Sequence, residues 1–129
     1  MPRHKVLGIC FDHVHMGDHL RLIEAHPDAE IAGIYDPDPA RMQSAIETFA
    51  IPPERVFTDL DACLAVPGAE LAILCCKTAD RAPMVERIAP HGLSVMVEKP
   101  FAPSVVDARR MIAAMEQFGG RLAVNWPLA

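Results

Sequence analysis

The stretch VMVEKPFAPSVVDARRMI, residues 95–112, decides the fold class of this chain. It joins an apolar run, which ends at Glu98 and Lys99, to a helical pattern that begins at Ser104. Ser104 and Asp107 form a variant of the capping box, with aspartate in place of the more common glutamate. An apolar strand followed by a capped helix is the repeating unit of a parallel sheet.

The helix expected after Ser104 has one apolar face, formed by Ala108, Met111, Ile112 and Met115. Gly119 and Gly120 follow this pattern and predict the end of the helix.

The same alternation runs through the whole chain. Apolar runs predict strands at residues 5–10, 30–35, 56–57, 71–76, 93–97 and 122–124. Helical spacing predicts further helices at residues 16–25, 38–49, 60–64 and 81–89, with Asp38 as an N-cap and Pro39 in the first turn. We therefore expect an α/β fold: a Rossmann-type, doubly wound parallel sheet of about six strands in three α/β/α layers.

Composition limits the function classes. The 129 residues suit one domain, and they are 51% apolar and 22% charged, as in globular proteins. A formal net charge of -5 argues against nucleic acid or an anionic membrane as a partner. We find no apolar run of about 20 residues and no signal peptide. The four cysteines lack a C-x-x-C pair, which favours reduced thiols in a cytoplasmic protein.

Parallel sheets bind ligands beyond the carboxyl ends of their strands. The second predicted strand ends at Asp36, whose carboxylate could accept both hydroxyls of an adenosine ribose and would repel a 2′-phosphate. This favours NAD over NADP. The alternative is that Asp36 only begins the turn of the DPDP segment.

The first turn departs from the G-x-G-x-x-G pattern of dinucleotide-binding folds, in which glycines let backbone amides approach the pyrophosphate. Residues 10–15 are CFDHVH, without glycine, and Asp12 brings a negative charge near the diphosphate position. His15 and His19 have the i, i+4 spacing of possible metal ligands, but this spacing alone is not a recognised signature. We expect no metal here. A histidine that contacts phosphate or substrate, and a plain polar loop, remain alternatives.

Two stretches, HPDAEIAGIYDPDPAR at 26–41 and VMVEKPFAPSVVDARRMI at 95–112, resemble the amino-terminal domain of the Gfo/Idh/MocA oxidoreductases. The resemblance covers essentially the whole chain. It implies an NAD(P)-binding domain over residues 1–129 and hydride transfer to or from a sugar, polyol or related small molecule. It also implies a carboxy-terminal substrate domain, which these residues do not include, so that the missing domain or a second copy of the chain is the expected partner.

The resemblance assigns a role to Lys99, which would hydrogen-bond the substrate oxygen and stabilise its developing negative charge. Glu98 would orient this lysine or contact the nicotinamide ribose, and the bond before Pro100 is often cis in the family. A surface Glu–Lys turn is the alternative. The expected cofactor-binding residues are Cys10, Phe11, Asp12, His13, His15, Asp36, Arg41, Cys76, Lys77, Thr78, Glu98 and Lys99, with Lys99 also catalytic.

After the fourth strand the family usually has a T-P-N turn and then a histidine, where this chain has Cys76, Lys77, Thr78 and Arg81. Lys77 and Arg81 could offset Asp12 near a phosphate, or form a solvated loop. Because the glycine turn is degenerate, a non-catalytic nucleotide- or metabolite-binding module is the alternative function.

Overall fold

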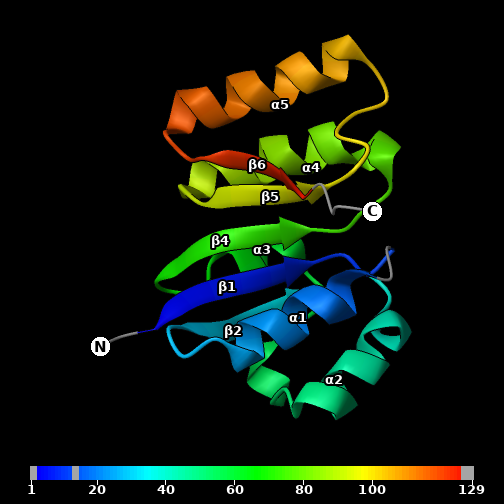
Figure 1. The fold of residues 1–129 in the computed structure, drawn as a ribbon, viewed down its shortest axis with the longest axis vertical. Coiled ribbons are helices and arrows are strands. Elements are labelled where there is room, and N and C mark those ends of the chain that lie inside the picture. Colours follow the sequence, from blue (N-terminus) through cyan, green and yellow to red (C-terminus); the bar gives the residue numbers. More distant parts are fainter. Residues whose placement is uncertain (1–2, 13–14, 126–129) are drawn as a thin grey trace.

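The computed structural model describes residues 3–12 and 15–125 of the chain. Six parallel strands form one sheet in the order β3-β2-β1-β4-β5-β6 (Figure 1). The strands are β1 His4–Ile9, β2 Ala29–Tyr35, β3 Val56–Phe57, β4 Ala69–Leu74, β5 Ser94–Glu98 and β6 Leu122–Asn125. The sheet is doubly wound and parallel, as the sequence predicted, and its order is that of the Rossmann fold.

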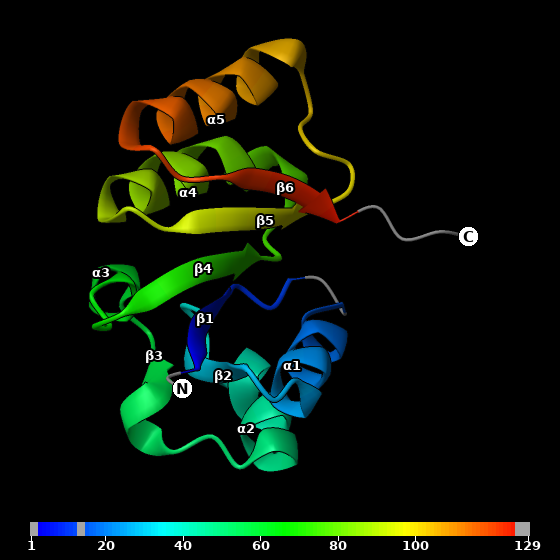
Figure 2. The same cartoon turned by 60° about the vertical axis from the view of Figure 1, so that its left-hand side comes forward.

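Helices cover the two faces of the sheet. The α-helices are α1 His15–Ala25, α2 Gln43–Phe49, α3 Leu60–Leu64, α4 Arg81–Ile88 and α5 Val105–Phe118. Figures 1 and 2 show α1 and α2 on one face, and α3 and α4 on the other, where α5 packs against α4. The result is the expected three-layer α/β/α sandwich.

Each face has its own apolar core. Leu7, Leu74 and Val97 belong to the core under α3, α4 and α5, whereas Leu20 and Ile34 belong to the core under α1 and α2. Among the described residues, no helix lies in front of β5 and β6 on the α1 face (Figure 1). That uncovered part of the sheet carries the half-buried side chain of Met96.

The predicted helix caps are present. The Ser104 hydroxyl accepts a hydrogen bond from the Asp107 amide at 3.1 Å, which begins α5. Asp38 accepts from Ala40 at 3.0 Å, but the predicted helix over 38–49 divides into a 3-10 turn, Pro39–Met42, and α2.

Two details of the sequence prediction are wrong. Ile112 was placed on the buried face of α5, yet 44% of its surface is exposed, because it lies at the rim of the helix beside the edge strand β6. The fourth strand ends at Leu74, so Cys75 and Cys76 lie just beyond β4.

The four cysteines are unpaired and buried, as the sequence predicted. Among the residues that the structure describes, no helix is both long and apolar enough to cross a bilayer.

Candidate cofactor and catalytic site

The residues predicted to act together lie at one edge of the sheet, where parallel strands place their carboxyl ends. Cys10 follows β1, Asp36 follows β2, Cys76 follows β4 and Glu98 ends β5. His13 lies outside the described residues.

The first turn keeps an unusual backbone conformation. Cys10 has a φ of 69°, in the left-handed region that glycine adopts easily and other residues rarely do. Its amide donates to the Tyr35 carbonyl at 2.8 Å, and its side chain is only 6% exposed. A cysteine therefore occupies a backbone conformation for which dinucleotide-binding turns use glycine.

Asp36 is fully buried and organises this turn. One carboxylate oxygen accepts from the Phe11 amide and the other from the Asp38 amide, both at 2.8 Å. The carboxylate thus ties the end of β1 to the end of β2. The predicted contact with a ribose would require the remaining lone pairs of these oxygens.

Asp12 has a partner that sequence reasoning missed. The guanidinium of Arg41 donates to its carboxylate, across 29 positions of sequence. The sequence suggests Lys77 and Arg81 as cations that could offset Asp12. Only the folded structure shows that the turn after β2 brings Arg41 next to the first loop.

Arg81 is not part of a solvated loop, since it is 1% exposed. Its Nη1 donates to the carbonyls of Glu98 and Pro100, and its Nη2 donates to the Cys76 carbonyl at 3.5 Å. Its Nε is buried without a hydrogen-bond partner among the described residues. Arg81 therefore joins the start of α4 to the turn that carries Lys99.

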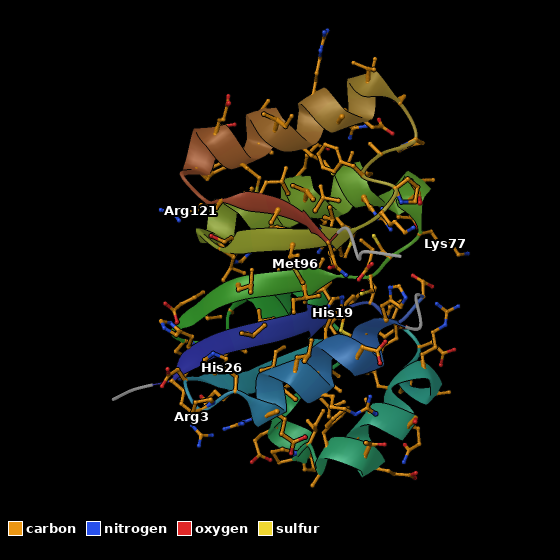
Figure 3. All side chains as sticks on the ribbon, in the orientation of Figure 1. Arg3, His19, His26, Lys77, Met96 and Arg121 are labelled. Atoms are coloured by element: carbon orange, nitrogen blue, oxygen red, sulfur yellow. The ribbon has the colours of Figure 1, made fainter. Side chains whose placement is uncertain are left out.

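Lys77 and Thr78 differ from Arg81 in exposure. Lys77 is exposed and points away from the sheet edge (Figure 3), and Thr78 is half-buried at the start of a short 3-10 turn. Of the two, Lys77 is accessible to an anionic ligand.

Glu98 is 1% exposed and is the centre of a polar cluster. Its carboxylate accepts from His19, from Asn125 at 3.1 Å and from His15 at 3.2 Å. Figure 3 shows His19 directed from α1 towards β4 and β5. Burial alone would raise the pKa of Glu98, but the hydrogen bonds from His19, Asn125 and His15 outweigh it and lower the pKa to about 2.

Lys99 follows this cluster and is exposed at the sheet edge. The peptide bond between Lys99 and Pro100 is cis. Buried Glu98 and exposed Lys99 are neighbours with opposite environments, so the carboxylate is fixed within the protein while the ammonium can meet a ligand.

The sequence matches a known family over most of the chain. The family model described as "Oxidoreductase family, NAD-binding Rossmann fold", of the Gfo/Idh/MocA type, matches residues 13–126. The chain belongs to the Gfo/Idh/MocA oxidoreductase family. The fold and the family are therefore those that the sequence predicted. The chain is an NAD-binding Rossmann domain of this family.

Two curated relatives of this Gfo/Idh/MocA domain are sugar or polyol dehydrogenases. The D-apiose dehydrogenase of Paraburkholderia graminis is 32% identical over 108 residues, which cover 84% of this chain and 28% of that enzyme. The inositol 2-dehydrogenase of Streptomyces avermitilis is 30% identical over 111 residues, covering 84% of this chain and 32% of that enzyme. The chain thus spans about a third of the length of these relatives.

A solved structure of similar fold is the WlbA dehydrogenase of Bordetella pertussis in complex with NADH and UDP-GlcNAcA. It matches 96% of this Gfo/Idh/MocA domain and 35% of its own chain, with a TM-score of 0.85 and 26% identity.

Proposed function

We propose that this domain binds NAD and presents Lys99 to a sugar, polyol or related hydroxy compound during hydride transfer. The observation that carries the proposal is the first turn, where Cys10 keeps a left-handed conformation and Asp36 accepts from the Phe11 amide. A turn with the required backbone path can hold a pyrophosphate without the glycine residues themselves.

The charges near the end of β2 favour NAD over NADP. Asp36 lies beneath the turn, and Asp38 is exposed beside it. Asp12 engages Arg41, the cation best placed to meet a 2′-phosphate. A phosphate at this position would therefore meet three carboxylates and a guanidinium that is already paired.

Lys99 supports the chemical step. When bound, NAD would supply the hydride chemistry, and the hydroxyl proton would pass to a base in the protein that completes the pocket. The Lys99 ammonium would hydrogen-bond the substrate oxygen on which negative charge develops. Arg81 holds the carbonyls on both sides of Lys99 and so fixes the turn from which the ammonium extends.

We also propose that protein outside these residues completes the substrate pocket, either a carboxy-terminal domain or another subunit. Lys99 is exposed here, and hydride transfer requires a site from which water is excluded. The unpaired thiols support a reducing, cytoplasmic setting.

Calorimetric titration of the chain with NADH and, separately, NADPH tests the cofactor. We expect saturable binding of NADH with an affinity at least about tenfold higher than that of NADPH, a difference of about 1.4 kcal/mol. Equal affinities, or tighter binding of NADPH, would contradict the preference for NAD.

Lys99→Ala tests the catalytic role, in the protein together with the polypeptide that completes its pocket. We expect kcat to fall by about 100-fold or more while NADH affinity changes only a few-fold, since the contact strengthens in the transition state. Undiminished turnover would refute this role for Lys99.

A non-catalytic nucleotide- or metabolite-binding module is the second candidate, favoured by the absence of glycine from residues 10–15 and by the carboxylate of Asp12. Nucleotide binding without hydride transfer in the completed protein would support it.

A further inference from the structure

Three buried side chains that can bind metal ions come together inside the protein, from distant parts of the sequence. They are His19 of α1, Cys75 after β4 and Glu98 at the end of β5, all buried. Their donor atoms lie within 4.8 Å of one another. We propose that these three side chains, with His15 as a fourth ligand, bind a zinc-type divalent cation.

The donor set suits that chemistry. Two imidazoles, one thiolate and one carboxylate are the ligands from which four-coordinate zinc sites are built. Bonds of about 2.0–2.3 Å place neighbouring donors about 3.3–3.8 Å apart in a tetrahedron. The donors of His19, Cys75 and Glu98 lie within 4.8 Å of one another, and His15 Nδ1 lies 3.2 Å from the Glu98 carboxylate, so all four are close to this spacing.

Glu98 is the residue around which the site is arranged. One oxygen accepts from His19, and the other accepts from His15 Nδ1 at 3.2 Å. A cation bound here would replace these hydrogen bonds, so that metal binding releases protons from the histidine and cysteine ligands. Asn125, at 3.1 Å from the carboxylate, would hold Glu98 in position as an outer partner.

The cluster is reachable from solvent. A hollow opens on the part of the sheet that no helix covers, and Figure 3 shows Met96 and His19 on that face. It is lined by His15, Asp18, His19, Leu22, Met96 and Asn125. The exposed carboxylate of Asp18 at this hollow attracts a cation, and His15 lies between the hollow and the buried ligands.

Cys75 would bind the cation as a thiolate, so that its thiol proton leaves when the metal enters. The i, i+4 pair of His15 and His19 did not predict a metal by itself, because Cys75 and Glu98 come from distant parts of the sequence.

The first test is a titration of the full chain with Co²⁺ alone, without nucleotide, followed by absorption. We expect a one-to-one complex with the visible bands of tetrahedral cobalt and a thiolate-to-cobalt charge-transfer band, both removed by added Zn²⁺. Failure to form a one-to-one complex, or a complex without the charge-transfer band, would overturn the proposal. Since nucleotide is left out, the result is independent of the proposed oxidoreductase function.

Matched variants locate the ligands. Cys75→Ser should remove the charge-transfer band, whereas Cys63→Ser, a buried thiol in the other core, should keep it. His19→Gln should weaken Co²⁺ binding at least about tenfold. His26→Gln, beyond the far end of α1, should leave binding unchanged (Figure 3). A charge-transfer band that survives Cys75→Ser would place the metal elsewhere.

X-ray absorption spectroscopy of the zinc-loaded wild-type chain is a second test, which does not require Cys75→Ser to fold. We expect one sulfur ligand among nitrogen and oxygen ligands. A zinc coordination shell without sulfur would contradict the assignment of Cys75.

Discussion

Cys10 holds a left-handed backbone conformation, φ 69°, with its side chain buried. Such a conformation costs a non-glycine residue about 1–3 kcal/mol, which the surrounding hydrogen bonds must offset. The amide of Cys10 bonds Tyr35 and the next amide bonds Asp36, so the turn is held on both sides. Cofactor binding is expected to depend on this backbone path more than on the thiol.

We expect Cys10→Val to lower the free energy of unfolding by about 2 kcal/mol, because a β-branched residue is strained at positive φ. Cys10→Gly relieves the strain but loses a buried side chain, so its stability should stay within about 1 kcal/mol of wild type. Urea denaturation of the three proteins measures the difference. Equal stability of the valine and glycine variants would show that the turn is not strained.

Because the pKa of Glu98 is lower in the folded state than in the unfolded state, the free energy of unfolding depends on pH in the acid range. The folded state binds this proton less readily than the unfolded state, so the stabilisation is fully present above about pH 4.5 and is lost as pH falls towards 2. A shift of this size corresponds to about 3 kcal/mol.

We therefore expect the stability difference between wild type and Glu98→Gln to shrink by up to about 3 kcal/mol between pH 5 and pH 2, as followed by urea denaturation. Glu24→Gln, on the exposed side of α1, controls for the loss of one acidic charge. A difference that stays constant over this range would mean that Glu98 is not held ionised by its neighbours.

At the scale of elements, Arg81 connects α4 to the turn after β5. Arg81→Met would leave the buried Glu98 carbonyl and the partly buried Pro100 carbonyl without their donor. We expect a loss of about 3 kcal/mol in unfolding free energy, and weaker NADH binding because the turn that carries Lys99 loses its support. Thermal denaturation and calorimetry measure the two effects.

Arg87→Met is the matched control, on the same helix. Arg87 pairs with Asp61 at 2.9 Å on the surface, where both side chains are at least half exposed, so its loss should cost less than about 1 kcal/mol. Similar losses for the two arginines would refute the structural role given to Arg81.

Ser104 begins α5, the longest helix. Ser104→Ala should cost about 1 kcal/mol in a urea denaturation, because the Asp107 amide loses its acceptor. Ser44→Ala, at an exposed position inside α2, should be neutral or slightly stabilising. A destabilisation by Ser44→Ala as large as that by Ser104→Ala would contradict the capping role.

At the scale of the whole molecule, local patterns were enough to predict the sheet and its layers. The apolar runs, the caps at Asp38 and Ser104, and Gly119 are read from neighbouring residues, and their alternation predicts a parallel sheet between two helical layers. The order of the strands is given only by the structure. Ile112 was misplaced because its exposure depends on β6 being the last strand of the described sheet.

The site was predictable only in part, because its contacts cross the sequence. Strand ends identified Asp36, Glu98 and Lys99, but no local pattern pairs Arg41 with Asp12 or buries Arg81 against the 98–100 turn. The cluster around Glu98 likewise joins residues 79 and 83 positions apart. Such pairs are fixed by the packing of the strands and become visible only in the fold.

We propose that the glycine-free turn forms a dinucleotide site at the carboxyl edge of the sheet. Backbone amide NMR shifts, followed during a titration with NADH, would locate this site. We predict saturable shifts concentrated at Cys10, Phe11, Asp36, Lys77 and Lys99. Shifts that do not saturate, or that gather at the opposite edge near Glu30 and Arg55, would contradict the claim.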